Sequence, residues 1–126
     1  MANRKPIEIG EWYHCYNRGV DKRRVFSGPQ DYNRFLIQMY LANNKGKSVP
    51  SNRYSPSSSR ILLKNLRPSE TLVEVGAYCL MPNHVHFVLK EVEEGGIATF
   101  MQRIFTGYTM YFNQKNDRTG SLFAGS

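Results

Sequence analysis

The sequence of 126 residues predicts an α+β fold, in which two helices cover one face of an antiparallel sheet. Apolar residues recur at helical spacing in residues 29–43 and 97–113, and strand-forming residues alternate in residues 11–18, 71–80 and 84–89. The length suits one domain that spans residues 1–126, with a modest core between two layers.

The first predicted strand places Trp12, His14 and Tyr16 on one face, and Gly19 ends it. A basic loop follows, and it gives four cations within seven residues: Arg18, Lys22, Arg23 and Arg24. Such a cluster at the end of a strand is either a solvated loop or a set of phosphate contacts. We favour phosphate contacts because the whole chain carries a positive excess.

The first helix is expected to use Ser27 as its N-cap and to end near Asn43. Residues 44–60 are rich in serine and nearly free of apolar side chains, which predicts a flexible loop. The second helix contains Gly107, which costs about 1 kcal/mol relative to alanine. The glycine indicates close packing or a nucleic-acid contact, and the commoner alternative is a glycine that the helix simply tolerates.

A turn at residues 81–83 leads into the strand that carries His84 and His86. Side chains alternate along a strand, so the two histidines share one face, opposite the apolar side chains of Val85, Phe87 and Leu89. Two imidazoles on one strand can hold a divalent metal ion and leave its other positions open. The alternative is a pair of ordinary surface histidines.

The elements follow the order strand, helix, strand, strand, helix, and residues 121–123 begin a further strand. This order is typical of a ferredoxin-like sandwich in which the last strand has barely begun.

The composition favours a polyanionic partner. Lysine and arginine outnumber aspartate and glutamate by 17 to 10, which gives a net charge of +7 and a pI near 9.6. Cys15 and Cys79 form no Cys-x-x-Cys motif, and we expect them to be reduced core residues of a cytoplasmic protein. No signal peptide or membrane-spanning segment is expected.

Four blocks together resemble the REP-associated tyrosine transposases, which belong to the single-tyrosine HUH transposases of insertion sequences. The blocks are YHCYNRG at 13–19, GAYCLMPNHVH at 76–86, YTMYFN at 108–113 and RTGSLF at 118–123. The resemblance implies binding and cleavage of hairpin-forming single-stranded DNA through a phosphotyrosine intermediate. It also implies that His84, His86 and a third polar ligand hold Mg²⁺ or Mn²⁺, which polarises the scissile phosphate.

The chain departs from this family at its C-terminal side. In the family, the nucleophilic tyrosine and the third ligand lie on a further helix, beyond the Gly-Ser-Leu-Phe block. We therefore expect this chain to lack the last strand and that helix. Tyr108 and Tyr111 are weak replacements as nucleophile because both lie on the apolar stripe, with Tyr111 the less implausible. His14 is either an extra polar group near the metal or a structural histidine.

The expected DNA contacts are the basic side chains Arg18, Lys22, Arg23, Arg24, Arg103, Lys115 and Arg118. An unpaired sheet edge could also join two copies of the chain in a homodimer. Two other functions stay open. One is a single-stranded nucleic-acid-binding module without catalysis, and the other is a metal-dependent hydrolase of small phosphate esters.

Overall fold

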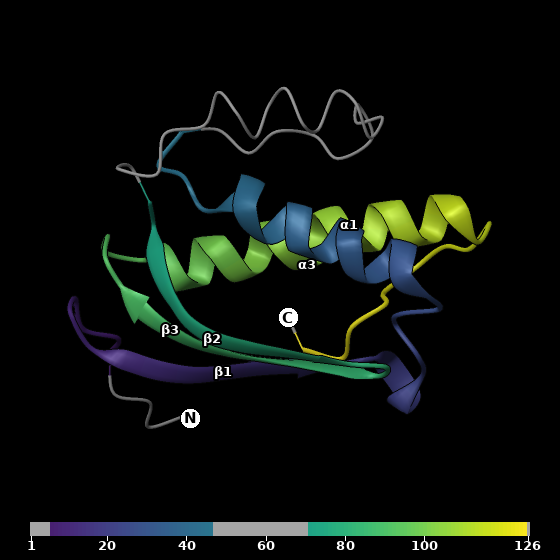
Figure 1. Ribbon diagram of the computed structural model, residues 1–126, viewed down its shortest axis with the longest axis horizontal. Helices are drawn as coiled ribbons and strands as arrows, with labels where there is room; N and C mark the ends of the chain where they lie inside the picture. The colour runs from purple at the N-terminus through teal and green to yellow at the C-terminus, as the bar shows by residue number, and fades with distance from the viewer. Residues whose placement is uncertain (1–5, 47–70, 126) are drawn as a thin grey trace.

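A computed structural model describes residues 6–46 and 71–125 of the chain (Figure 1). Its elements, in chain order, are β1 (Trp12–Arg18), the short 3-10 helix η1 (Val20–Lys22), α1 (Pro29–Ala42), β2 (Val73–Met81), β3 (His84–Glu91) and α3 (Gly96–Lys115). The expected loop at 44–60 lies outside the described residues from residue 47 onward.

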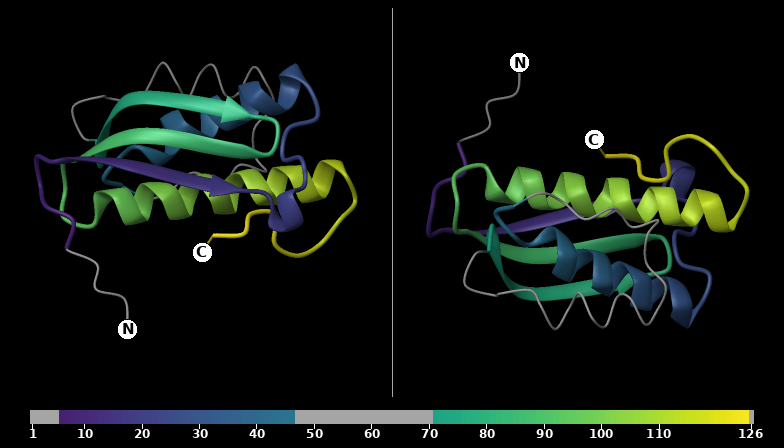
Figure 2. Two further views of the ribbon diagram at one scale, coloured as in Figure 1. Left: turned by 90° about the horizontal axis from the view of Figure 1, so that it is seen from below. Right: turned by 90° about the horizontal axis from the view of Figure 1, so that it is seen from above.

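The three strands form an antiparallel sheet in the order β1-β3-β2, and both helices pack on the same face of it (Figures 1 and 2). This confirms the predicted α+β class. The C-terminal segment continues the sheet beside β1, where Gly19 and Phe123 form an isolated antiparallel bridge. The amide of Ala124 donates to the carbonyl of Arg18 at 2.8 Å. The arrangement is compatible with a ferredoxin-like sandwich.

The core lies between the sheet and the helices. Val85, Phe87 and Leu89 of β3 are fully buried there, as the alternation of this strand predicts. Phe87 meets Phe100 of α3 edge-on at 6.3 Å and stacks with Phe35 of α1 at 6.1 Å between ring centroids. The buried face of β3 therefore fixes which way its alternate residues, the histidines, must point.

Helices α1 and α3 pack closely around Gly107. A β-carbon at this position would come within 2.6 Å of the buried side-chain amide of Gln38 on α1. The packing explanation for Gly107 is thus the one that the structure supports. At the end of α1, the side-chain oxygen of Asn43 accepts from the amides of Leu72 and Val73, which ties this helix to the start of β2.

Two expectations need correction. The N-cap of α1 is Gly28 rather than Ser27, and the carboxylate of Asp31 accepts from the Ser27 amide instead. Cys79 is exposed rather than part of the core, because it pairs with His86 on the face of the sheet that neither α1 nor α3 covers, whereas Cys15 is half-buried.

In the described residues, the structure contains no helix with the length and apolar character that a membrane crossing requires.

Candidate functional site

The face of the sheet opposite the helices, called here the open face, carries the candidate site (Figure 2). Directly paired residues of antiparallel strands share a face, so the strand register identifies its members. They are Trp12, His14, Tyr16 and Arg18 on β1, His84, His86, Val88 and Lys90 on β3, and Glu74, Ala77, Cys79 and Met81 on β2.

The predicted histidine pair lies on this face. The rings of His84 and His86 are perpendicular, with 4.9 Å between their centroids. Nδ1 of His84 is 2.7 Å from Oδ1 of Asn83, and Nδ1 of His86 is 3.0 Å from Nε2 of His14. Nδ1 of His84 and Nδ1 of His86 thus each have a hydrogen-bond partner. The Nε2 atoms of these two histidines have no hydrogen-bond partner among the described residues.

These partners suit metal-binding histidines. A ligating histidine commonly donates its other N–H to a neighbouring oxygen or nitrogen, which fixes the tautomer and the ring orientation. Asn83 Oδ1 can only accept, so His84 donates from Nδ1 and keeps a lone pair on Nε2. His86 keeps the same lone pair when it donates from Nδ1 to His14.

The charge state of His86 also suits ligation. Desolvation on the sheet surface, followed by repulsion from His84 and His14, lowers the pKa of His86 below its ordinary value. A lowered pKa keeps the ring uncharged at neutral pH, which is the form that binds a metal ion. His14, which sequence analysis placed near the pair as an extra polar group or a structural histidine, is the group that orients His86.

The pair supplies part of a ligand set. No group of three or more histidine, cysteine, aspartate or glutamate side chains within residues 6–46 and 71–125 is placed to hold a metal ion. Two imidazoles with oriented Nε2 atoms fit an ion that keeps its remaining positions for water or phosphate oxygens, as Mg²⁺ commonly does. The residues present therefore fit the two-histidine half of the predicted metal centre.

Comparisons with protein-family models, with curated proteins and with solved structures find no match to this chain. The family resemblance of the four sequence blocks therefore stays a prediction, and the function rests on the geometry of the open face.

The basic loop after β1 is attached to the turn that precedes the histidines. The amide of Gly19 donates to the Asn83 carbonyl at 2.9 Å, and the amides of Val25 and Phe26 both donate to the Pro82 carbonyl. Two segments more than fifty residues apart in sequence thus lie side by side at one end of the open face. This close backbone approach explains why residue 19 is a glycine, because a β-carbon there would lie 2.2 Å from the Arg23 carbonyl oxygen.

The seven predicted DNA contacts comprise three free cations, one half-buried arginine and three cations with intramolecular bonds. The side chains of Arg18, Lys22 and Arg24 are exposed and make no hydrogen bond or ion pair with the described residues. Arg18 pairs with His84 in the sheet, and the other two belong to the adjoining loop. Arg23 is half-buried and lies over the ring of Phe112 at 5.4 Å. The free cations therefore gather beside the histidine pair.

The other three cations have intramolecular roles. Arg103 donates to the carbonyls of Ala42, Asn44 and Gly46 and so closes the end of α1. Lys115 forms an ion pair with the buried Asp31 at 2.7 Å, and Arg118 bonds to Asn113 and to the Ser121 carbonyl. The structure thus gives each of these three side chains a role in joining helices or turns, and their contact with DNA stays a prediction.

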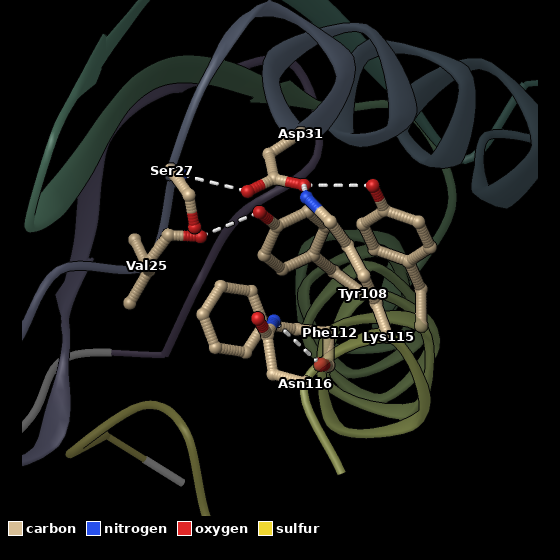
Figure 3. A network of polar contacts seen from close by, with 8 residues as sticks. Val25, Ser27, Asp31, Tyr108, Phe112, Lys115 and Asn116 are labelled. Carbon is tan, nitrogen blue, oxygen red and sulfur yellow. Dashed lines mark hydrogen bonds and ion pairs between the residues drawn. The ribbon is translucent and has the colours of Figure 1, made fainter. Parts of the chain in front are cut away.

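Neither tyrosine of α3 reaches the histidine pair. Tyr108 is fully buried and donates to the Val25 carbonyl at 2.5 Å (Figure 3). Tyr111 donates to Asp31 between the helices at 2.7 Å. Burial, together with the charge of Asp31, raises the pKa of both hydroxyls. Both side chains lie on the helix side of the sheet, so the sheet separates Tyr111 from the metal site for which it was considered.

Tyr16 was not among the site residues predicted from the sequence. This residue is 64% exposed, and its ring stacks with that of His86 at 5.8 Å between centroids. Among the described tyrosines, it is the one whose side chain shares the open face with the histidines. The alternation of the first strand placed Tyr16 on the same face as His14. Its position next to His86 depended on the pairing of β1 with β3, which the alternation does not show.

Proposed function

We propose that this chain is a metal-dependent enzyme domain that breaks and rejoins single-stranded DNA, in the manner of the HUH transposases. One observation carries the proposal: His84 and His86 project from one strand with both Nδ1 atoms hydrogen-bonded, beside a loop of free cations. The strand order, with the C-terminal segment beside β1, supports the ferredoxin-like form of the fold that the resemblance implies.

The residues suggest a division of labour. His84 and His86 would hold Mg²⁺ or Mn²⁺, which when bound supplies a positive charge for an oxygen of the scissile phosphodiester. Arg18, Lys22 and Arg24 would bind neighbouring phosphates and hold the strand in register. A tyrosine hydroxyl would lose its proton to water as its oxygen attacks phosphorus, the bond to the 3′-oxygen would break, and that oxygen would take up a proton from water. The reverse step joins a 3′-hydroxyl to the phosphotyrosine.

The proposal leaves the nucleophile to experiment, and Tyr16 is the first residue to test. Its hydroxyl belongs to the open face, whereas those of Tyr108 and Tyr111 are engaged between the helices. A nucleophile needs access to phosphorus at the position where the metal acts. Tyr16 meets the requirement of access, and its stacking on His86 places it next to the candidate metal ligand.

Covalent capture tests the proposal. The protein is mixed with end-labelled hairpin single-stranded DNA and Mn²⁺, and adducts are separated on a denaturing gel. We expect an adduct that requires the metal and disappears in His84→Ala. Loss of the adduct in Tyr16→Phe, but not in Tyr111→Phe, would assign the nucleophile. Metal affinity that is unchanged in the double variant His84→Ala, His86→Ala would refute the metal centre.

The aromatic side chains of the open face favour a second candidate, a single-stranded nucleic-acid-binding module without catalysis. Trp12 is 49% exposed and Tyr16 is 64% exposed on the same strand face. Exposed aromatic rings on a sheet stack with bases in several single-strand-binding folds. This candidate predicts binding that is independent of the metal and yields no adduct, so the capture assay separates the two functions.

A further inference from the structure

Trp12 occupies the end of the open face away from the histidines. It lies four residues before Tyr16 on β1, which places the two side chains about 13 Å apart along the strand. It is the one tryptophan in the chain. None of the roles assigned above to the histidine pair or to the basic loop involves this residue.

The indole of Trp12 lies close to the backbone of Gly76. A β-carbon at Gly76 of β2 would come within 2.7 Å of Cζ3 of Trp12, and two further ring carbons lie within 3.4 Å of the same position. Because Gly76 is on the opposite edge strand, the indole reaches across β3 to touch it. The ring therefore occupies space that is left by a glycine, and half of its surface stays open to solvent.

Charged side chains lie beside the indole and at the other end of the same face. Lys90, the register partner of Trp12, has its ammonium 5.8 Å from the ring centroid. Lys90 also forms an ion pair with Glu74 at 3.4 Å, so the charged groups at this end of the face balance each other. Arg18 lies at the other end of the same face, and the free cations Lys22 and Arg24 belong to the loop that follows it. An aromatic surface with cations at its other end is complementary to a strand that carries both bases and phosphates.

We propose that Trp12, packed against Gly76, is a stacking site for one unpaired base of single-stranded DNA bound along β1. The inference rests on the proposed function, because it assumes that one strand of DNA passes the histidines and also reaches the indole. Stacking on an aromatic ring tolerates every base, so this site adds affinity and sets the path of the strand without reading its sequence.

The fluorescence of Trp12 provides a direct test because no other tryptophan contributes to the signal. The probe is an unlabelled oligothymidylate of about 16 nucleotides, the upper end of known site sizes, titrated at low salt. A second probe has the same backbone but lacks bases. We expect oligothymidylate to quench the emission and the abasic strand to leave it nearly unchanged. Binding of both strands is followed independently by the anisotropy of an end label.

Two variants address the site. Trp12→Leu removes the ring, and Gly76→Val displaces it from this space while leaving the indole present. Each should weaken oligothymidylate binding by about tenfold, as loss of one stacked base does, and leave binding of the abasic strand unchanged. Trp12→Phe should retain most of the affinity. Tyr78→Leu is the matched control, since Tyr78 is 52% exposed on the other face of the same sheet.

The outcomes separate this inference from the proposed function. Oligothymidylate binding with no change in Trp12 emission, and equal affinity in Trp12→Leu, would overturn the stacking site and leave the strand-transfer proposal standing. Absence of binding to any single strand by anisotropy would overturn both. Because Trp12 is half exposed, Trp12→Leu is expected to unfold at nearly the temperature of the parent, which circular dichroism verifies.

Discussion

Replacing Tyr111 with phenylalanine should destabilise the fold and leave DNA chemistry intact. The Tyr111 hydroxyl donates to Oδ1 of Asp31, which also accepts from Lys115, while the other carboxylate oxygen accepts from the Ser27 amide (Figure 3). Asp31 is fully buried at the start of α1, and Tyr111 and Lys115 belong to the end of α3. The network therefore joins the two helices through one carboxylate.

The size of the effect follows from the partners that remain. A hydrogen bond to a charged group contributes about 1.5–3 kcal/mol, and the variant loses one such bond. Oδ1 of Asp31 still accepts from Lys115, so no buried charge is left without a partner. We therefore expect the lower end of that range, about 1.5 kcal/mol in the free energy of unfolding, measured by urea denaturation. Tyr78→Phe, at an exposed position, should change it by less than about 0.5 kcal/mol.

The difference should depend on pH. Burial alone would raise the pKa of Asp31, but the bonds from Lys115, Tyr111 and Ser27 outweigh it and hold the pKa below the ordinary value. Stability from a lowered carboxyl pKa is fully present above the unfolded pKa, about 3.9, and is lost as the pH falls through the folded pKa. The gap between parent and Tyr111→Phe should therefore narrow on acidification. An unchanged stability at pH 7, or loss of the DNA adduct with stability intact, would refute this reasoning.

Three further results are expected. His14→Ala should weaken Mn²⁺ binding by about 10- to 100-fold in calorimetry, and His14→Gln should recover part of it, because His14 orients His86 rather than binding the ion. Replacing both Lys22 and Arg24 with alanine should make the logarithm of the single-strand binding constant less dependent on the logarithm of the salt concentration. The slope should fall by about 1.4, or about 0.7 for each phosphate contact. Arg103→Ala should instead lower the melting temperature, because Arg103 bonds to carbonyls at the end of α1. Light scattering tests the predicted homodimer, and a strict monomer would remove the idea of pairing through a sheet edge.

The periodicity of apolar residues predicted the strands and the two α-helices, and it predicted which side chains of β3 face the core. The three described strands and the helices α1 and α3 begin and end within about two residues of their predicted bounds, because buried apolar residues recur at the spacing of each element. The short helix η1 was expected as a loop. The shared face of His84 and His86 followed from the same alternation. Local sequence patterns carry this information because the core selects one face of each element.

The partners of the polar side chains could not be predicted in the same way. Arg103 and Lys115 look like free cations in sequence, and only the packing of α3 on α1 brings them to carbonyl groups and to Asp31. Tyr16 and His14 belong to the candidate site because β1 pairs with β3, which brings together residues about 70 positions apart. Pairing of this kind depends on the topology of the sheet, which sequence spacing within one element does not contain.

The attachment of the basic loop to the turn at Pro82 bears on the entropy of ligand binding. Backbone amides of Gly19, Val25 and Phe26 are already fixed to the turn in the free protein. A loop that became ordered only on contact with DNA would lose conformational freedom, at about 0.5–1.5 kcal/mol for each immobilised side chain and more for its backbone. Here the backbone part of that loss occurs on folding. The cations consequently meet the strand from a scaffold whose ordering does not reduce the affinity.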